Sequence, residues 1–454
     1  MSEGMTRNGI AAKDTVGTER PPRVHIYSDL FLPEPNNHGA GLVICSQVQA
    51  FLDLGFKVEF VFIRKWDKVP PSQGYFKEIT CTVVDARDER PPWYARLAYR
   101  ARWPRKLALH QLYPARNVLL REVRSRIQED GESIHVFDQV GTANVILDLP
   151  KSRMVYSNIE IESELTALRM AAEREITKRK LYGWERRKLR RMSELERKVA
   201  RSSGLVLCVA TEDARRITEE WLAPRAAYLP ISIANGDTPV AGRESRIDKV
   251  LRLLHIGGIS HFPSFTSLEF LFTKVFPLLD ADTISRLQFE VVGNTSVDIE
   301  RTQAIMEMAR PYPMVHFSGF VEDIRSAYRR NDLHVVASTH ATGLRTRIIE
   351  SWAFGMPVLS TTKGAVGVEH LSSGGNILIA DDPRDFARNL RELIHSPERL
   401  DEIAIAARKT YDAYFSRRAV ADALRELLNT HFGLRLPPVA APEGALVDSP
   451  QIRP

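Results

Sequence analysis

Short apolar runs rich in β-branched and aromatic residues alternate along the chain with longer stretches of helical periodicity. Runs of this length, bounded by turn-forming residues, predict buried strands. In the first half they cover residues 23–30, 57–63, 79–86, 133–139, 153–159 and 204–210. Because strands that alternate with helices form parallel sheets, the first half predicts a Rossmann-like α/β domain.

The same alternation starts again after a segment of turn formers and charged residues. In the second half the strand-like runs cover residues 250–258, 287–294, 314–320, 332–338, 356–362 and 376–380. The predicted class is therefore α/β, with two Rossmann-like domains. The predicted segments are a disordered 1–22, a domain 23–235, a linker 236–248, a domain 249–412, a helix within 413–435 (about Arg417 to Leu428) that crosses back to the first domain, and a disordered tail 436–454.

The segment 338–361 joins a strand, a glycine turn and a helix that we expect to end near Phe354, where Gly355 and Pro357 follow. The helix would bury one apolar face, while Arg347 and Glu350, three residues apart, share another face. The residues expected in the core are Ile348, Ile349, Trp352 and Ala353.

The start of this helix is a candidate anion site. Free backbone N–H groups at a helix N-terminus attract anions, and Arg345 and Arg347 add charged donors. The other interpretation is an ordinary strand–helix unit in which Arg347 and Glu350 merely pair.

Composition describes a globular protein with material for two or three hydrophobic cores, since 44% of its 454 residues are hydrophobic and 26% are charged. No apolar run approaches the roughly 20 residues of a membrane helix, and the N-terminus lacks a signal-peptide core, so we expect a cytoplasmic protein. Cys45, Cys81 and Cys208 are widely spaced, which predicts reduced core residues rather than disulfides or metal ligands.

The net charge of +6 is unevenly distributed. Segment 93–126 carries nine Lys/Arg against one acidic residue, and segment 169–201 carries thirteen against five. Aromatic residues interleave with arginines in the first segment, which favours an anionic membrane surface as partner. Nucleic acid is disfavoured because no nucleic-acid module signature is present, and a solvated helix face with ion pairs remains an alternative for the second segment.

The segment GLRTRIIESWAFGMPVLSTTKGAVGVE (343–369), with HIGG (255–258), VVGN (291–294) and FSGFVED (317–323), resembles blocks of the retaining glycosyltransferases of family 4. The resemblance covers roughly residues 23–428 and is strongest to an exopolysaccharide-type subgroup. It implies the GT-B architecture, in which two Rossmann-like domains face a cleft.

The resemblance also implies roles for individual residues. Glu350 would hold the ribose of a nucleotide sugar, while Arg345 and Arg347 would clamp its diphosphate. Gly39 and Gly41 match a glycine-rich loop that approaches the sugar phosphate, although simple turn geometry explains them equally well. The other implied donor-site residues are Gly257, Gly258, His261, Gly293, Phe320, Val321, Thr342, Gly343 and Leu344.

Three features of the family pattern are missing, at four positions of this sequence. Thr342 stands where the family has the first glutamate of its pair, and Gly258 and Pro263 stand where it has a basic clamp. The position at which the family has a catalytic histidine in its N-terminal domain aligns with Phe137 of this sequence. We therefore name the adjacent Asp138 as a catalytic candidate with Arg347 and Glu350, and interpret His135 as a hydrogen-bonded strand residue.

These implications predict an enzyme that transfers a sugar, with retention, from a UDP- or GDP-sugar to a glycan or polyprenyl-linked acceptor in polysaccharide biosynthesis. No cofactor beyond the nucleotide sugar and no metal is expected, because electrostatic stabilisation by the arginines would suffice. Two alternatives stay open: a nucleotide-sugar epimerase of the same fold, and a degenerate subunit that binds without turnover.

Overall fold

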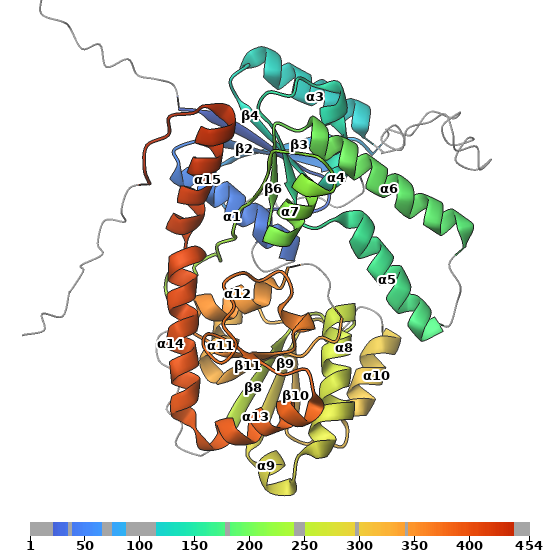
Figure 1. The fold of residues 1–454 in the computed structure, drawn as a ribbon, viewed down its shortest axis with the longest axis vertical. Helices are drawn as coiled ribbons and strands as arrows, with labels where there is room; N and C mark the ends of the chain where they lie inside the picture. Colours follow the sequence, from blue (N-terminus) through green and yellow to red (C-terminus); the bar gives the residue numbers. More distant parts are fainter. Residues whose placement is uncertain are drawn as a thin grey trace, which may run out of the picture.

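A computed structural model of the protein describes residues 21–34, 39–65, 75–87, 115–177, 182–239, 250–295, 299–340 and 344–439. Two α/β domains lie one above the other, each built on a parallel sheet (Figure 1). Several predictions concern residues outside these ranges: the disordered ends over 1–20 and 440–454, linker positions 240–248, basic positions 93–114, and Thr342 and Gly343.

The N-terminal domain contains a seven-stranded sheet in the order β3-β2-β1-β4-β5-β6-β7. Every neighbouring pair is parallel, and the order reverses between β1 and β4. The strands are β1 (Arg23–Ser28), β2 (Lys57–Arg64), β3 (Thr80–Asp85), β4 (Ile134–Asp138), β5 (Met154–Asn158), β6 (Leu205–Cys208) and β7 (Ala226–Tyr228). The sequence pattern predicted all of them except β7, whose three residues are only half-buried and so carry little apolar signal.

The C-terminal domain contains a six-stranded parallel sheet in the order β10-β9-β8-β11-β12-β13, which is the Rossmann order with its reversal between β8 and β11. The strands are β8 (Leu251–Ile256), β9 (Leu287–Val292), β10 (Val315–Gly319), β11 (Leu333–Val336), β12 (Val358–Ser360) and β13 (Leu378–Ile379). The predicted α/β class with two Rossmann-like domains is confirmed.

Helices cover both faces of each sheet. In the N-terminal domain they are α1 (Gly39–Asp53), α3 (Arg116–Glu129), α4 (Gln139–Ala143), the 3-10 helix η2 (Asn144–Asp148), α5 (Glu162–Thr177), α6 (Gly183–Ser202) and α7 (Thr211–Glu219). In the C-terminal half they are α8 (Phe262–Phe270), η3 (Leu271–Val275), η4 (Phe276–Leu278), α9 (Ala281–Ser285), α10 (Ile299–Ala309), α11 (Ile324–Arg330), α12 (Thr346–Ala353), η5 (Lys363–Ala365), α13 (Pro383–His395), α14 (Pro397–Tyr414) and α15 (Arg417–Phe432).

Helix α15 packs on the N-terminal domain although it follows the C-terminal one in sequence (Figure 1). Its four fully buried side chains join the core that α1 shares with the first sheet, and Arg417 pairs with Asp53 of α1. The buried residues are Val420, Ala421, Leu424 and Leu428. The last helix therefore ties the two domains together.

Two further sequence expectations need correction. Cys81 lies on the edge strand β3 and is exposed, whereas Cys45 and Cys208 are buried, so only two of the three free cysteines are core residues. Five of the six residues of β3 are exposed or half-buried, so this strand has little cover on its faces. Helix α1 begins at Gly39, so Gly39 and Gly41, which the resemblance places in a loop, belong to its first turn.

Candidate functional site

Helix α12 forms where its sequence predicts, because its apolar positions recur at helical spacing. Ile348, Ile349, Trp352 and Ala353 are at most 1% exposed, which confirms the predicted core face. The helix ends at Ala353, and Gly355 adopts the left-handed conformation (φ 72°) that a turn after a helix requires. This packing fixes the opposite face, which carries Arg347 and Glu350.

Glu350 is buried but belongs to a hydrogen-bonded network. Its Oε2 accepts a hydrogen bond from the Arg347 guanidinium (2.6 Å) and another from the Tyr328 hydroxyl (2.9 Å). Burial acts to lower the pKa of Arg347, but the nearby Glu350 carboxylate outweighs it, so the pKa is raised. Arg347 and Glu350 therefore do form a pair, with Tyr328 as a third member.

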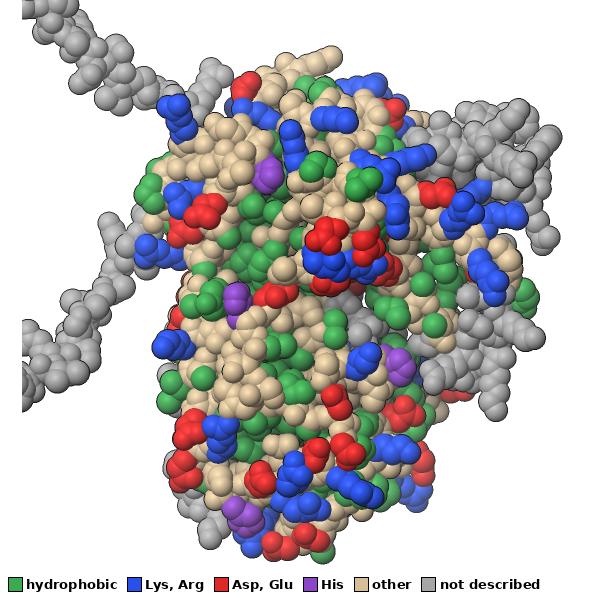
Figure 2. All heavy atoms as spheres, viewed as in Figure 1, with side chains coloured by type: hydrophobic (Ala, Val, Ile, Leu, Met, Phe, Trp, Pro, Cys, Tyr) green, Lys and Arg blue, Asp and Glu red, His purple; other side chains and the backbone are tan. Residues whose placement is uncertain are grey.

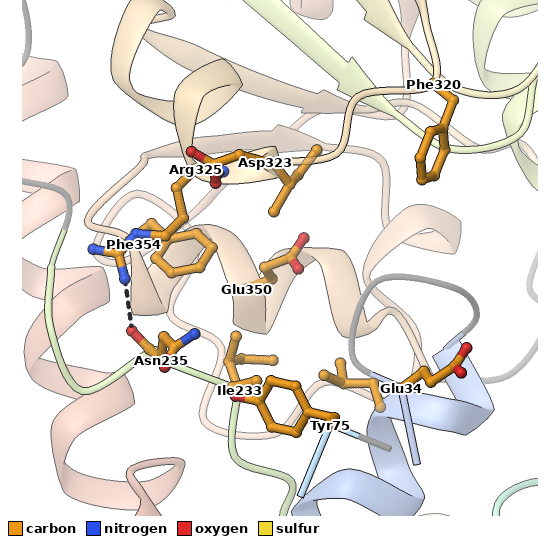
Figure 3. A pocket seen from close by; sticks show the side chains of 12 residues that line it. Glu34, Tyr75, Ile233, Asn235, Phe320, Asp323, Arg325, Glu350 and Phe354 are labelled. Carbon is orange, nitrogen blue, oxygen red and sulfur yellow. Dashed lines mark hydrogen bonds between the residues drawn. The ribbon is translucent and has the colours of Figure 1, made fainter. Parts of the chain in front are cut away.

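Glu350 also lines a cavity of about 430 Å³ between the two domains (Figure 3). The C-terminal domain contributes Phe320, Asp323, Ile324, Arg325, Glu350 and Phe354; the N-terminal domain contributes Glu34, Leu42 and Tyr75; and the interdomain connection contributes Ile233, Ala234 and Asn235. Phe320 is 65% exposed, which is unusual for an aromatic residue at the end of a strand. The cavity thus combines apolar walls with a few polar groups, as small-molecule sites do.

The interdomain connection is held by arginines from the C-terminal domain. Arg325 donates to the carbonyl oxygens of Asn235 (3.2 Å, Figure 3) and Thr238 (3.3 Å), and its guanidinium lies over the Phe354 ring at 5.4 Å. Arg408 of α14 donates to the carbonyl oxygen of Gly236 (2.7 Å). One wall of the cavity is therefore a clamped stretch of the chain that joins the domains.

Arg345 precedes α12 but does not line this cavity. It donates to the carbonyl oxygen of His340 (3.0 Å), and its Nε is buried without a hydrogen-bond partner in the described structure. Burial lowers its pKa to about 10, and Glu160 of the N-terminal domain acts in the opposite direction. A buried donor without a partner, close to a helix N-terminus, suits an anionic ligand.

The N-termini of two helices meet across the domains at this point. A Cβ built on Gly39 would lie 3.6 Å from the Thr346 hydroxyl, so the first turn of α1 touches the first turn of α12. A Cβ on Gly41 would lie 2.9 Å from the carbonyl oxygen of Glu34, so this position has no room for a larger residue. Gly41 therefore serves close packing against the chain that precedes α1, whereas Gly39 lies at the junction where two positive helix ends converge.

The turn between β8 and α8 contains Gly257, Gly258 and His261. Gly258 packs on the His261 ring, and a Cβ on Gly293 would overlap the carbonyl oxygen of Gly257 at 1.8 Å. These glycines allow the ends of β8 and β9 to approach closely. Phe320 lines the cavity, whereas Val321 and Leu344 pack against the apolar cluster around α12.

Asp138 lies at the carboxyl end of β4, remote in sequence from α12, and is 2% exposed. Its Oδ2 accepts a hydrogen bond from Ser28 (2.9 Å), while Oδ1 is buried without a partner in the described structure. Burial raises its pKa to about 8, and the Asp29 and Glu162 carboxylates act in the same direction. At neutral pH the Asp138 side chain is therefore mostly a neutral acid.

His135 has the structural role expected of it. It is 1% exposed and its ring bonds the hydroxyls of Tyr27 (3.0 Å) and Ser133 (3.1 Å). Burial lowers its pKa to about 3, so it stays neutral.

Sequence reasoning missed Glu34, Tyr75, Asn235 and Arg325 as cavity residues. Each lies in a polar or turn-rich segment whose sequence gives no sign that folding brings it to Glu350. In the described ranges, no group of three or more His, Cys, Asp or Glu side chains could hold a metal ion. Across the same ranges, every helix is too short or too polar to cross a membrane.

Comparison with known proteins finds similarity to glycosyltransferases. Residues 251–396 match the family model described as Glycosyl transferases group 1. The lipopolysaccharide core biosynthesis glycosyltransferase LpsE of Rhizobium meliloti (strain 1021) is 31% identical over 115 residues, which are 25% of this chain and 34% of LpsE. The chain thus aligns with about a third of the length of this curated relative.

Solved structures match nearly the whole chain. Sucrose-phosphate synthase from Thermosynechococcus elongatus is 13% identical with a TM-score of 0.66, covering 91% of this chain and 99% of that one. HepE of Anabaena in complex with UDP-glucose is 14% identical with a TM-score of 0.58, covering 90% and 99%. At such low identity the likeness shows the fold alone, which is the GT-B architecture predicted from the sequence.

Proposed function

We propose that this protein is a glycosyltransferase that takes a sugar from a UDP- or GDP-sugar. The observation that carries the proposal is Glu350, a buried carboxylate that lines a 430 Å³ interdomain cavity within the stretch that matches the group 1 glycosyltransferases. Its neighbours Arg347 and Tyr328 fix its orientation, so a ribose hydroxyl in the cavity would meet an organised acceptor of hydrogen bonds.

The diphosphate would lie at the junction of α1 and α12. Here two helix N-termini converge and Arg345 and Arg347 add two guanidinium groups. As the bond from the sugar to the diphosphate breaks, negative charge grows on the leaving oxygen, and preorganised cationic donors stabilise it. These charges support our expectation that transfer needs no metal. Turnover that EDTA abolishes and Mg²⁺ or Mn²⁺ restores would overturn that expectation.

Transfer with retention requires the acceptor hydroxyl to attack from the face that the diphosphate leaves. The acceptor would enter from the N-terminal domain, where we propose that a glycan or polyprenyl-linked glycan binds during polysaccharide assembly. LpsE is named for lipopolysaccharide core biosynthesis, which supports this pathway class. The anomeric configuration of the product, followed by NMR, tests retention directly.

The best test of the donor site is a panel of nucleotide sugars offered to the wild type and to a Glu350→Ala, Arg347→Ala double variant. We expect the wild type to bind at least one nucleoside diphosphate and the double variant to lose that binding. Arg388→Ala, which alters an exposed arginine on α13, is the matched control. If no nucleoside diphosphate binds the wild type, the proposal is wrong, and conversion of the sugar without an acceptor would indicate an epimerase.

We further propose that the enzyme works at the cytoplasmic face of an anionic membrane. Helices α5 and α6 pack together and project from the N-terminal domain (Figure 1), and Figure 2 shows Lys and Arg side chains gathered in this region. Tyr182, 52% exposed at the start of α6, adds an interfacial aromatic group. The exposed basic residues of the first turns of α6 are Arg186, Arg187, Lys188 and Arg190.

Sedimentation with vesicles that contain phosphatidylglycerol tests this surface. Neutralising those four residues to glutamine should reduce vesicle binding at least tenfold, because each cation near an anionic surface contributes about 1 kcal/mol. Binding that does not change would remove the membrane proposal and leave the α6 face as a solvated surface. The matched control neutralises four exposed basic residues of the C-terminal half: Lys274, Arg310, Arg384 and Arg388.

A further inference from the structure

Three residues at the carboxyl edge of the first sheet have polar side-chain atoms that are buried without a hydrogen-bond partner in the described structure. They are Asp138 Oδ1, Gln139 Oε1, and both Oδ1 and Nδ2 of Asn158. These side chains are 2%, 7% and 1% exposed. Buried polar groups almost always have partners, so a cluster of orphans indicates a place where a ligand or ordered water supplies them.

The sheet topology brings these residues together. β4 and β5 are parallel neighbours, and Asp138 pairs in register with Ser157, the residue before Asn158. Asp138 also bonds Ser28 at the end of β1, and the strand order reverses between β1 and β4. Ligands of open α/β sheets bind outside the carboxyl ends of the strands at this reversal.

The backbone at this edge is strained. Gln139 has φ 62°, which lies in the left-handed region. Residues other than glycine rarely adopt this conformation. Such conformations persist where the surrounding structure enforces them, and they occur preferentially at functional sites. The turn also has little free space, since a Cβ on Gly141 would lie 3.2 Å from the Asp29 carboxylate.

The chemistry of the unpartnered atoms selects a class of ligand. The amides of Gln139 and Asn158 each combine donors and an acceptor, and Asp138 is a carboxyl group that burial keeps protonated, with a pKa of about 8. None of the three is a cation, and the cation nearest to them, Lys65, is already paired with the Asp29 carboxylate. A sugar hydroxyl, which is uncharged and both donates and accepts, complements this set.

We propose that Asp138, Gln139 and Asn158 form a sugar-hydroxyl site in the N-terminal domain, opposite the nucleotide site on α12. This inference rests on the proposed glycosyltransferase function and adds two binding residues to it, Gln139 and Asn158. The ligand group is a pair of neighbouring hydroxyls on a pyranose ring. The transferred sugar of the donor and a sugar of the acceptor both offer such a pair, so the ring belongs to one or the other.

Asn158→Leu tests the site, because it removes both orphaned atoms while keeping the side-chain size. Asn389→Leu, on α13, is the matched control. Calorimetry first compares a bare nucleoside diphosphate, which keeps the ribose but lacks the sugar to be transferred, with the nucleotide sugar identified in the donor screen. Acceptor KM and the rate of donor hydrolysis are then measured on the same proteins.

If the ring belongs to the donor, Asn158→Leu binds the bare nucleotide as the wild type does and the nucleotide sugar at least tenfold more weakly. If it belongs to the acceptor, donor binding and hydrolysis are unchanged while acceptor KM rises at least tenfold. Either pattern supports the site.

Unchanged donor and acceptor parameters overturn the site, since the orphaned atoms would then hold only water, and the glycosyltransferase proposal would stand. Loss of bare-nucleotide binding also overturns it, because the role of Asn158 would then be structural. A wild type that binds no nucleoside diphosphate defeats the proposed function instead. Gln139→Gly, which relieves the strained φ and removes the orphaned oxygen, should reproduce the pattern of Asn158→Leu.

Discussion

Replacing Glu350 by glutamine separates the charge of this residue from its shape. Glutamine has nearly the same volume, so the packing of α12 should survive, and the melting temperature checks this. The loss is the negative charge on a side chain that is 3% exposed and already accepts bonds from Arg347 and Tyr328. A hydrogen bond to a charged group contributes about 1.5–3 kcal/mol. One such bond to a ribose therefore predicts nucleotide binding roughly 10- to 150-fold weaker.

Isothermal titration calorimetry with UDP and GDP at neutral pH measures this loss. Tyr328→Phe provides the graded comparison, because it removes one neutral donor to Glu350 and leaves the carboxylate in place. We expect Tyr328→Phe to weaken binding by less than tenfold, and Glu350→Gln to weaken it by more than Tyr328→Phe does.

Two outcomes would refute this reasoning. If Glu350→Gln binds nucleotide as tightly as the wild type, the carboxylate does not contact the ligand, and its pair with Arg347 only supports the fold. If Glu350→Gln and Tyr328→Phe weaken binding equally while both lower the melting temperature, the loss comes from disordered packing around α12.

Three other predictions concern stability. Gly293→Ala should lower the unfolding free energy by about 1–3 kcal/mol through overpacking, whereas Gly183→Ala, in open space, should not; equal melting temperatures would contradict this. Asp138→Asn should stabilise the protein more at pH 9 than at pH 5. Burial raises the pKa of Asp138 to about 8 in the folded state, so the wild type loses stability as pH rises from the ordinary carboxyl pKa to this value, and asparagine avoids that loss. Denaturant titrations in which the variant and the wild type differ equally at both pH values would refute this. Leu424→Ala should cost about 2–5 kcal/mol by leaving a cavity under α15, while the exposed Glu426→Ala should be nearly neutral by the same titration.

The sequence predicts α12 and its core face well because the signal is local. The spacing of Ile348, Ile349 and Trp352 determines which side packs inward, and Gly355 stops the helix. Arg347 and Glu350 are then placed on the other face by geometry alone. The strands are equally local, since runs such as 251–256 are buried on both faces and need no tertiary information to be identified.

The cavity is different because its wall is assembled from segments with no local signal. Tyr75 follows a polar stretch, Asn235 lies in the connection between domains, and Arg325 is one of several arginines in α11. Packing between the two domains, in which α14 and α15 take part, brings Tyr75 and Asn235 to the cavity that Glu350 lines. Likewise, no pattern announces that Asn158 would be buried without partners, because the neighbouring strands that surround it come from distant parts of the chain.

The two domains divide the chemistry of the proposed reaction between them. The C-terminal domain supplies Arg345 and Arg347, whose charges suit a diphosphate, and the carboxylate of Glu350. The N-terminal edge supplies a neutral acid and amides, which suit hydroxyls. The proposed reaction therefore uses both edges at once. Since Asn235 lies in the connection between the domains and also lines the cavity, a ligand there contacts the segment that joins the two domains.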